Sequence, residues 1–160
     1  MAVNFSNEKL VKISCDKICD DNHDVQNLIS SNDIDRRKGF LVEYYIRPPV
    51  TVKVEFLIHN FDLMYIELGL KVRQHQVRGV EVYTQTDSDC NQMIAKYFNI
   101  TEKLIIINNC YTPSRHLPKI SFSESAKFYV AGRNIKYCNN IKYIFLKIFS
   151  TINSTVPCLR

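Results

Sequence analysis

The sequence contains 160 residues, carries a formal net charge of +5, and is 46% hydrophobic and 23% charged. This length and composition are typical of one soluble globular domain, and a chain of this size buries roughly 70% of its unfolded surface. The apolar runs are too short to span a membrane, and the amino-terminal residues carry neither a basic leader nor a continuous apolar segment. We therefore expect a single domain over residues 1–160 that neither crosses a membrane nor is secreted.

The first predicted elements are a short strand and a compact turn. Residues 11–15 alternate between apolar and polar side chains, which indicates a half-buried strand. Residues 25–30 predict a brief helical turn or a loop whose apolar side chains plug one end of a β-sandwich. Residues 30–39 are polar and predict a connection, in which Gly39 supplies a permissive backbone before the next strand.

The middle of the chain carries the clearest strand patterns. Residues 40–46 are aromatic and β-branched, and a pair of prolines ends this run. Residues 50–56 alternate strictly, which places three valines and Phe56 on one face of a strand. Residues 61–70 and 77–84 predict two more strands, with the valines at 80 and 82 facing inward.

Four further runs follow in the second half of the chain. Residues 93–100 suit the helical and the strand period equally, so both remain open. Residues 104–108 form a continuous apolar run, which is typical of a strand buried on both faces. Residues 126–131 and 141–149 are rich in β-branched and aromatic residues and predict strands. This succession of short strands without a long helical pattern predicts an all-β sandwich or barrel.

No constellation of catalytic or cofactor-binding residues accompanies the strands. Cys15, Cys19 and His23 come nearest to a metal site, but zinc requires a fourth converging ligand. No serine lies in a Gly-x-Ser-x-Gly elbow, and the four glycines are too dispersed for a phosphate-binding loop. We expect no metal, no other cofactor, and six reduced cysteine thiols. The cysteines are Cys15, Cys19, Cys90, Cys110, Cys138 and Cys158.

Several motifs together resemble a known domain. They are Val25-Gln-Asn-Leu-Ile, Gly39-Phe followed by Glu43-Tyr-Tyr-Ile-Arg-Pro-Pro-Val, Gly79-Val-Glu-Val-Tyr-Thr, and the near-terminal Val156-Pro-Cys-Leu-Arg. With the alternating strand between them, these segments resemble the RING finger protein 37 family of U-box ubiquitin ligases and the wider galactose-binding-like (discoidin-like) jelly-roll pattern. The resemblance covers nearly the whole chain, is densest between Cys15 and Thr84, and is weak over residues 87–140.

The resemblance implies a fold and a role. The fold would be an all-β, galactose-binding-like jelly roll. In the family this domain precedes a U-box and a RING finger, which recruit ubiquitin-conjugating enzymes, and this chain contains neither. We therefore expect a non-catalytic domain whose ligase activity belongs to a longer parent in the nucleus, the cytoplasm or both. In the family the chain continues past the proline-cysteine element into a further short strand, whereas this sequence ends at Arg160. We therefore expect a truncated or alternatively ended product that lacks its last strand.

Basic and aromatic residues near the run 40–46 form the candidate binding surface. Arginine pairs bidentately with carboxylates and phosphates, and loops at one end of a sandwich often carry recognition. The alternative is that residues 36–38 form a solvated loop and the tyrosines belong to the core or its rim. The candidate residues are Arg36, Arg37, Lys38, Tyr44, Tyr45, Arg47 and Arg73.

These charges suggest the chemistry of the partner. We expect a protein or an acidic peptide, with a chaperone or a ligase substrate as the candidates. A ubiquitin-conjugating enzyme would bind only through the absent U-box. The competing hypothesis is a glycan- or nucleic-acid-binding sandwich, which the galactose-binding-like pattern and the basic residues after Glu124 motivate. Of these partners, nucleic acid is the less favoured.

Overall fold

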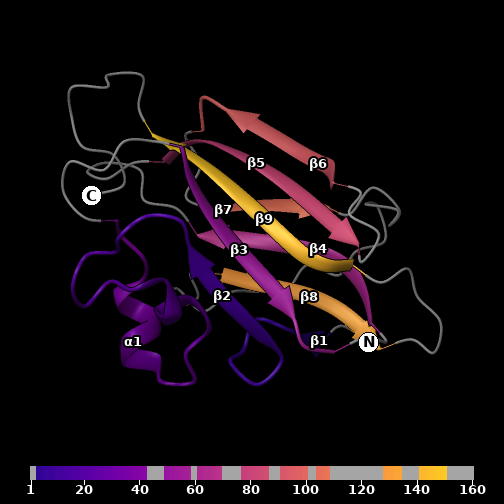
Figure 1. Ribbon diagram of the computed structural model, residues 1–160, viewed down its shortest axis with the longest axis horizontal. Helices are drawn as coiled ribbons and strands as arrows, with labels where there is room; N and C mark the ends of the chain where they lie inside the picture. The colour runs from indigo at the N-terminus through magenta and orange to yellow at the C-terminus, as the bar shows by residue number, and fades with distance from the viewer. Residues whose placement is uncertain are drawn as a thin grey trace.

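The computed structural model of the protein describes residues 3–42, 49–58, 61–69, 77–86, 91–100, 104–108, 128–134 and 141–150. These residues form two facing antiparallel β-sheets (Figure 1). One sheet has the order β1 (Val3–Asn4), β8 (Phe128–Asn134), β4 (Phe61–Gly69), β7 (Leu104–Asn108). The other has the order β2 (Val11–Cys15), β3 (Val50–Phe56), β9 (Ile141–Ser150), β5 (Val77–Thr86), β6 (Asn91–Phe98). The predicted all-β sandwich is confirmed.

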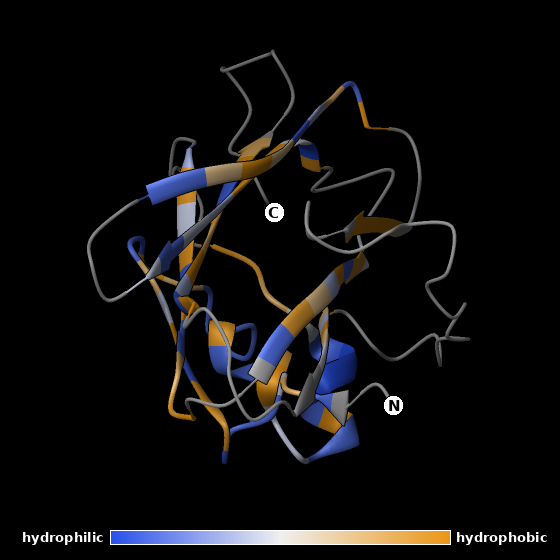
Figure 2. Cartoon of the chain, turned by 90° about the vertical axis from the view of Figure 1, so that its right-hand side faces the viewer, coloured by the Kyte–Doolittle hydropathy of each residue, from blue (hydrophilic) through white to orange (hydrophobic). Residues whose placement is uncertain are grey.

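The strands form where apolar residues recur at every second position. In β3 the residues Val50, Val52, Val54 and Phe56 have no exposed surface, while the residues between them are half-buried. The same alternation continues in β5, where the two inward valines are fully buried. Seen from the side, orange and blue segments alternate along the strands (Figure 2). A period of two therefore sends one set of side chains to the core and the other to the surface.

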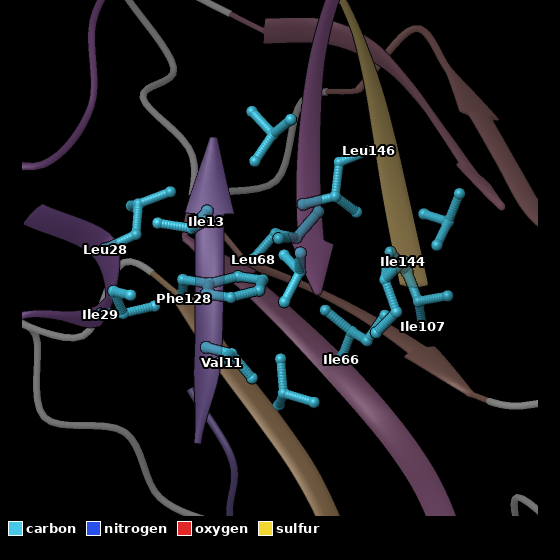
Figure 3. Packing of buried hydrophobic residues seen from close by; sticks show 14 of the residues in the cluster. Val11, Ile13, Leu28, Ile29, Ile66, Leu68, Ile107, Phe128, Ile144 and Leu146 are labelled. Atoms are coloured by element: carbon cyan, nitrogen blue, oxygen red, sulfur yellow. The ribbon is translucent and has the colours of Figure 1, made fainter. Parts of the chain in front are cut away.

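The core lies between the two sheets and is closed at one end by a helical turn. Side chains from strands of both sheets pack into one cluster (Figure 3). The 3₁₀ turn η1 (Val25–Ile29) adds its three apolar residues, Val25, Leu28 and Ile29, which are at most 9% exposed. The predicted turn that plugs the sandwich is thus confirmed.

The predicted polar connection over residues 30–39 contains a short helix, α1 (Asp33–Lys38), which is a correction. The side chain of Asn32 accepts a hydrogen bond of 2.8 Å from the backbone N–H of Ile34 and caps the helix. Gly39 ends it with a φ of 71°, a conformation that favours glycine. The acidic residues lie in the first turn and the basic residues in the last, so the charges oppose the helix dipole favourably.

Three strand predictions need separate comment. Residues 93–98 of the open run lie in the strand β6, and Asn99, with a φ of 57°, follows its end. The prediction that residues 104–108 are buried on both faces is wrong, because Ile106 is 43% exposed while Ile105 and Ile107 are buried. The strand β7 lies at the edge of an antiparallel sheet, and only one face of such a sheet packs on the core. Of the run 40–46, residues 43–46 lie outside the described residues, and Val42 makes an isolated bridge with Cys19.

The last two strands in the sequence lie inside the sheets. Strand β8 runs between β1 and β4, and β9 runs between β3 and β5, in each case antiparallel to its neighbours. The predicted strands at 126–131 and 141–149 are thus confirmed in their described parts. Within the described residues, no helix is long and apolar enough to cross a membrane.

Candidate functional site

Three of the seven predicted binding residues lie together on α1. Arg37 and Lys38 are exposed and Arg36 is half-buried. The Nζ atom of Lys38 is 3.8 Å from Oδ1 of Asp35, one turn earlier, and both side chains are more than 40% exposed. Such an exposed ion pair contributes little to stability. The other four predicted residues, Tyr44, Tyr45, Arg47 and Arg73, lie outside the described residues.

Asn27 fixes α1 to the end of the sandwich. Its side-chain amide donates hydrogen bonds of 2.9 Å to the backbone carbonyls of Asn22 and Gly39. The backbone N–H of Leu41 also donates to the carbonyl of His23 at 3.0 Å. These bonds connect the segment after α1 to η1, whose apolar residues are part of the core. The basic side chains of α1 are therefore presented from a helix that is anchored at its carboxyl end.

An acidic cleft of about 540 Å³ lies between the end of β2 and η1. Three aspartates, Asp20, Asp21 and Asp24, line it together with Lys17. Nδ1 of His23 is 2.8 Å from Oδ2 of Asp20. Sequence reasoning missed this cleft, although the aspartates between positions 16 and 24 are visible in the sequence. The cleft and α1 have opposite charges, so they would select different ligands.

The two cysteines of the acidic cleft are poorly suited to nucleophilic chemistry. Burial raises the pKa of Cys15, and it raises the pKa of Cys19 to about 12. A thiol with a raised pKa holds little thiolate at neutral pH, and the thiolate is the reactive form. Among the residues described, no three His, Cys, Asp or Glu side chains converge as metal ligands.

A buried carboxyl group lies on the outward side of the four-stranded sheet. A bulge between Leu63 and Tyr65 shifts the alternation of β4, so that Ile66 joins the core cluster while Tyr65 and Glu67 share the opposite face. Glu67 is 1% exposed, and its carboxyl oxygens have no hydrogen-bond partner in the described part of the chain. Burial raises its pKa to about 7. Across the strand pair it faces Tyr129, whose ring lies 6.3 Å from that of Tyr65.

The comparison with protein families identifies the group to which the chain belongs. The family of unknown function DUF5918 matches residues 4–104, which is more than half of the sequence. The chain belongs to this family. The match runs from Asn4 of β1 through β6, includes η1 and α1 with its basic residues, and stops at Leu104, the first residue of β7.

Among curated proteins, the chain is similar to RING finger protein 37 of mouse and human. The mouse protein is 40% identical over 74 residues, which are 46% of this chain, and the human protein is 41% identical over 78 residues, which are 48% of it. The aligned part is 14% of each relative, so the chain spans a small fraction of their length. The resemblance to this family that the sequence motifs indicated is confirmed over about half of the chain, which is less than the nearly whole chain that we expected.

Two solved carbohydrate-binding modules from Clostridium perfringens share the fold. The family 32 module of NanJ, in complex with galactose, superposes with a TM-score of 0.62 at 6% identity, covering 96% of this chain and 92% of the module. A second family 32 module, in complex with GlcNAc-α-1,4-galactose, gives 0.60 at 11% identity and covers 99% and 89%. At such low identity the likeness shows the fold alone. The fold is the predicted galactose-binding-like jelly roll.

Proposed function

We propose that the chain is a non-catalytic protein-binding module of a U-box-type E3 ubiquitin ligase, and that it recruits a substrate or a chaperone partner in the nucleus or the cytoplasm. The observation that carries the proposal is the identity of about 40% with RING finger protein 37. The aligned part is only 14% of that protein, which leaves ample room for ligase domains elsewhere. A ubiquitin-conjugating enzyme would bind those other domains and not this one.

The jelly-roll fold supports a binding role. Solved relatives of the fold are described in complex with sugars, so the scaffold can present a recognition surface. On this chain, the guanidinium groups of Arg36 and Arg37 and the ammonium group of Lys38 lie on one short helix at the end of the sandwich. The guanidinium group of an arginine can bind a carboxylate through two parallel hydrogen bonds. We therefore assign acidic peptide binding to α1, with Tyr44, Tyr45, Arg47 and Arg73 as further candidates.

A quantitative pull-down tests this assignment. The bait is the full chain, and the test variant carries Arg36→Gln, Arg37→Gln and Lys38→Gln, which remove three positive charges from an exposed helix. We expect the variant to capture the specific partners at least about fivefold less from nuclear extract, because each charge-assisted hydrogen bond contributes about 1.5–3 kcal/mol. The control variant is Lys9→Gln with Lys17→Gln, two exposed lysines outside α1. Equal capture by the wild type and both variants would refute the assignment.

The likeness to sugar-bound modules favours a second candidate, a glycan- or nucleic-acid-binding sandwich. Retention of the wild-type chain on galactose resin, with elution by free galactose, would support glycan binding. Binding to an oligonucleotide that weakens steeply with salt would support nucleic acid, because phosphate contacts release counterions. Absence of both results removes this candidate.

A further inference from the structure

The outward face of the five-stranded sheet combines aromatic rings and lysines. On the central strand β9, Ile144 and Leu146 are buried, so the residues between and beside them, Tyr143, Phe145 and Lys147, face away from the core. Strand pairing places Lys53 of β3 beside Phe145. In Figure 1 this sheet faces the viewer, and no described helix or strand lies in front of it. We call this surface the outer sheet face.

Three ammonium groups on the outer sheet face lie over aromatic rings. The Nζ atom of Lys53 is 4.5 Å from the ring centroid of Tyr143, and that of Lys96 is 5.2 Å from the centroid of Phe98. A third pair joins Lys147 and Phe149 at 5.9 Å. These contacts hold the ammonium groups beside the rings, so the outer sheet face presents cations and apolar area together.

One end of the outer sheet face is built around a glycine. The rings of Phe98 and Phe149 are 5.5 Å apart, and both residues pair with Gly79 across their strands. A Cβ atom at Gly79 would lie 2.5 Å from the ring of Phe98. The missing side chain therefore leaves room for the ring of Phe98, a residue that remains 48% exposed. Apolar area is thus available to a partner at this end.

The outer sheet face and its rim carry more positive than negative charge. Both glutamates are engaged: Glu81 accepts a 2.7 Å hydrogen bond from the hydroxyl of Tyr83 and lies 3.9 Å from Nζ of Lys96, and Glu55 lies 3.8 Å from Nζ of Lys142. Among the described residues, Lys53 and Lys147 have no carboxylate within ion-pair distance. The lysines are Lys12, Lys53, Lys96, Lys142 and Lys147. Two copies of this face would repel each other, whereas an acidic partner would be complementary.

The spacing of the lysines suggests the shape of the partner. Lys53 lies on β3 and Lys96 on β6, and the strands β9 and β5 lie between them. Neighbouring strands are roughly 4.8 Å apart, so β3 and β6, the two flanks of this surface, are about 14 Å apart. An α-helix with its side chains is about 10–12 Å wide. A helix laid along β9 would therefore place an apolar stripe on the rings and acidic residues beside both flanks. An extended peptide points alternate side chains up and down and would reach the flanks less well.

We propose that the outer sheet face docks an acidic amphipathic helix of a partner protein. The apolar stripe of the helix contacts Phe145, Phe149 and Phe98, and its carboxylates pair with Lys53 and Lys147, and with Lys96 in exchange for Glu81. This inference rests on the proposed function for the protein-binding role, but it assigns that role to a surface separate from α1.

The test uses a fluorescein-labelled helical peptide of eighteen residues, in which a leucine stripe is flanked by glutamates. Fluorescence anisotropy measures its binding to the full chain. The double variant Lys53→Gln with Lys147→Gln is expected to bind at least about tenfold more weakly, because both ammonium groups lose their charge. Lys9→Gln with Lys17→Gln is the matched control and should bind like the wild type. Thermal unfolding verifies that both variants remain folded.

A second variant and two further probes separate the alternatives. Phe145→Thr, which keeps a strand-forming residue, should also weaken binding, and the same peptide with glutamines in place of glutamates should not bind. Binding that is unchanged in the sheet variants but lost in the α1 triple variant would overturn this inference and leave the proposed function intact. Failure of the peptide to bind the wild type, or preferential binding of a dT20 oligonucleotide at Lys53 and Lys147, would also overturn it. If the wild type does not bind the peptide, and the α1 triple variant captures the same partners as the wild type in the pull-down, the proposed function is contradicted as well.

Discussion

At the scale of single residues, the buried carboxyl group of Glu67 makes the stability of the domain depend on pH. Burial raises its pKa from 4.5 to about 7 in the folded protein. The folded state therefore holds the proton more tightly than the unfolded chain. The corresponding stabilisation is fully present below about pH 4.5 and is lost as the pH rises through about 7. At about pH 7 the free energy of unfolding is lower than at pH 4.5 by about 3 kcal/mol.

The substitution Glu67→Gln tests this pH dependence. Glutamine has nearly the same shape and does not ionise, so the variant should be as stable as the wild type near pH 4.5. At pH 8 it should be more stable by up to about 3 kcal/mol, because only the wild type has to bury a charge or bind a proton. Urea unfolding at the two pH values measures the difference. Glu55→Gln, at a half-buried surface position, is the control and should show no such divergence. Parallel pH profiles for Glu67→Gln and the wild type would contradict the expectation.

The residue scale also shows where sequence reasoning stops. The charges at Arg36, Arg37 and Lys38 were visible in the sequence, and in the structure Arg37 and Lys38 are exposed while Arg36 is half-buried. Their neighbours in space depend on tertiary folding. The same holds for Glu67, because the face of the sheet on which it lies is set by a bulge in β4 that no local pattern in the sequence indicates.

At the scale of elements, two glycines give strands room for a phenylalanine, but the two positions differ in rigidity. A Cβ atom at Gly132 of β8 would lie 2.5 Å from the ring of Phe5 and 2.9 Å from the backbone carbonyl oxygen of Asp62 in β4. Phe5 is 1% exposed, so its ring is enclosed by the core. At Gly79 of β5 the nearest atoms belong to the half-exposed ring of Phe98, which can turn away.

The pair Gly132→Ala and Gly79→Ala therefore has unequal expected effects. Gly132→Ala should lower the free energy of unfolding by about 1–3 kcal/mol, because it overpacks the junction of β8 and β4. Gly79→Ala should change it by less than about 1 kcal/mol, since the ring clash is relieved at the surface and alanine restricts the unfolded chain. Chemical denaturation followed by far-UV circular dichroism measures both. Equal destabilisation of the two variants would show that Phe98 is as constrained as Phe5.

Strands and helices could be predicted from the sequence where the local pattern of apolar and polar residues was strong. Strands β3 and β5 were predictable because one face of each is buried, which produces strict alternation. The helix α1 was missed because it has only six residues and buries none of them, so it leaves no apolar periodicity. The exposure of Ile106 was also missed, because a continuous apolar run does not reveal that its strand lies at a sheet edge.

At the scale of the whole molecule, the family match does not coincide with a complete set of strands. It ends at residue 104. A chain truncated there lacks β7 beyond Leu104, β8, which separates β1 from β4, and β9, which separates β3 from β5. We expect this truncated chain to be unfolded, because both sheets lose an interior strand and the core loses Phe128, Ile144 and Leu146. Its circular dichroism spectrum should lack the strand signal of the full chain. A cooperative unfolding transition in the truncated chain would contradict this expectation.

The overall fold was accessible from the sequence for two independent reasons. Repeated alternation predicted a sandwich, and the motifs around residues 25–29 and 79–84 resembled a jelly-roll family. The sequence did not reveal the order of the strands, because pairing between β9 and its neighbours β3 and β5 joins residues that are far apart along the chain. The outer sheet face depends on this order, and it was therefore visible only in the structure.

The interior position of β9 has a consequence for biosynthesis. The ribosome releases a protein from its amino terminus, so β3 and β5 emerge before the strand that pairs with both of them. At bacterial or eukaryotic rates of elongation, the delay is on the order of several seconds. During this interval the unpaired backbone groups of β3 and β5 are open to contacts with other nascent chains. The two sheets can therefore be completed only after β9 has left the ribosome, and the yield of the domain in cells should depend on how well the growing chain is shielded until then.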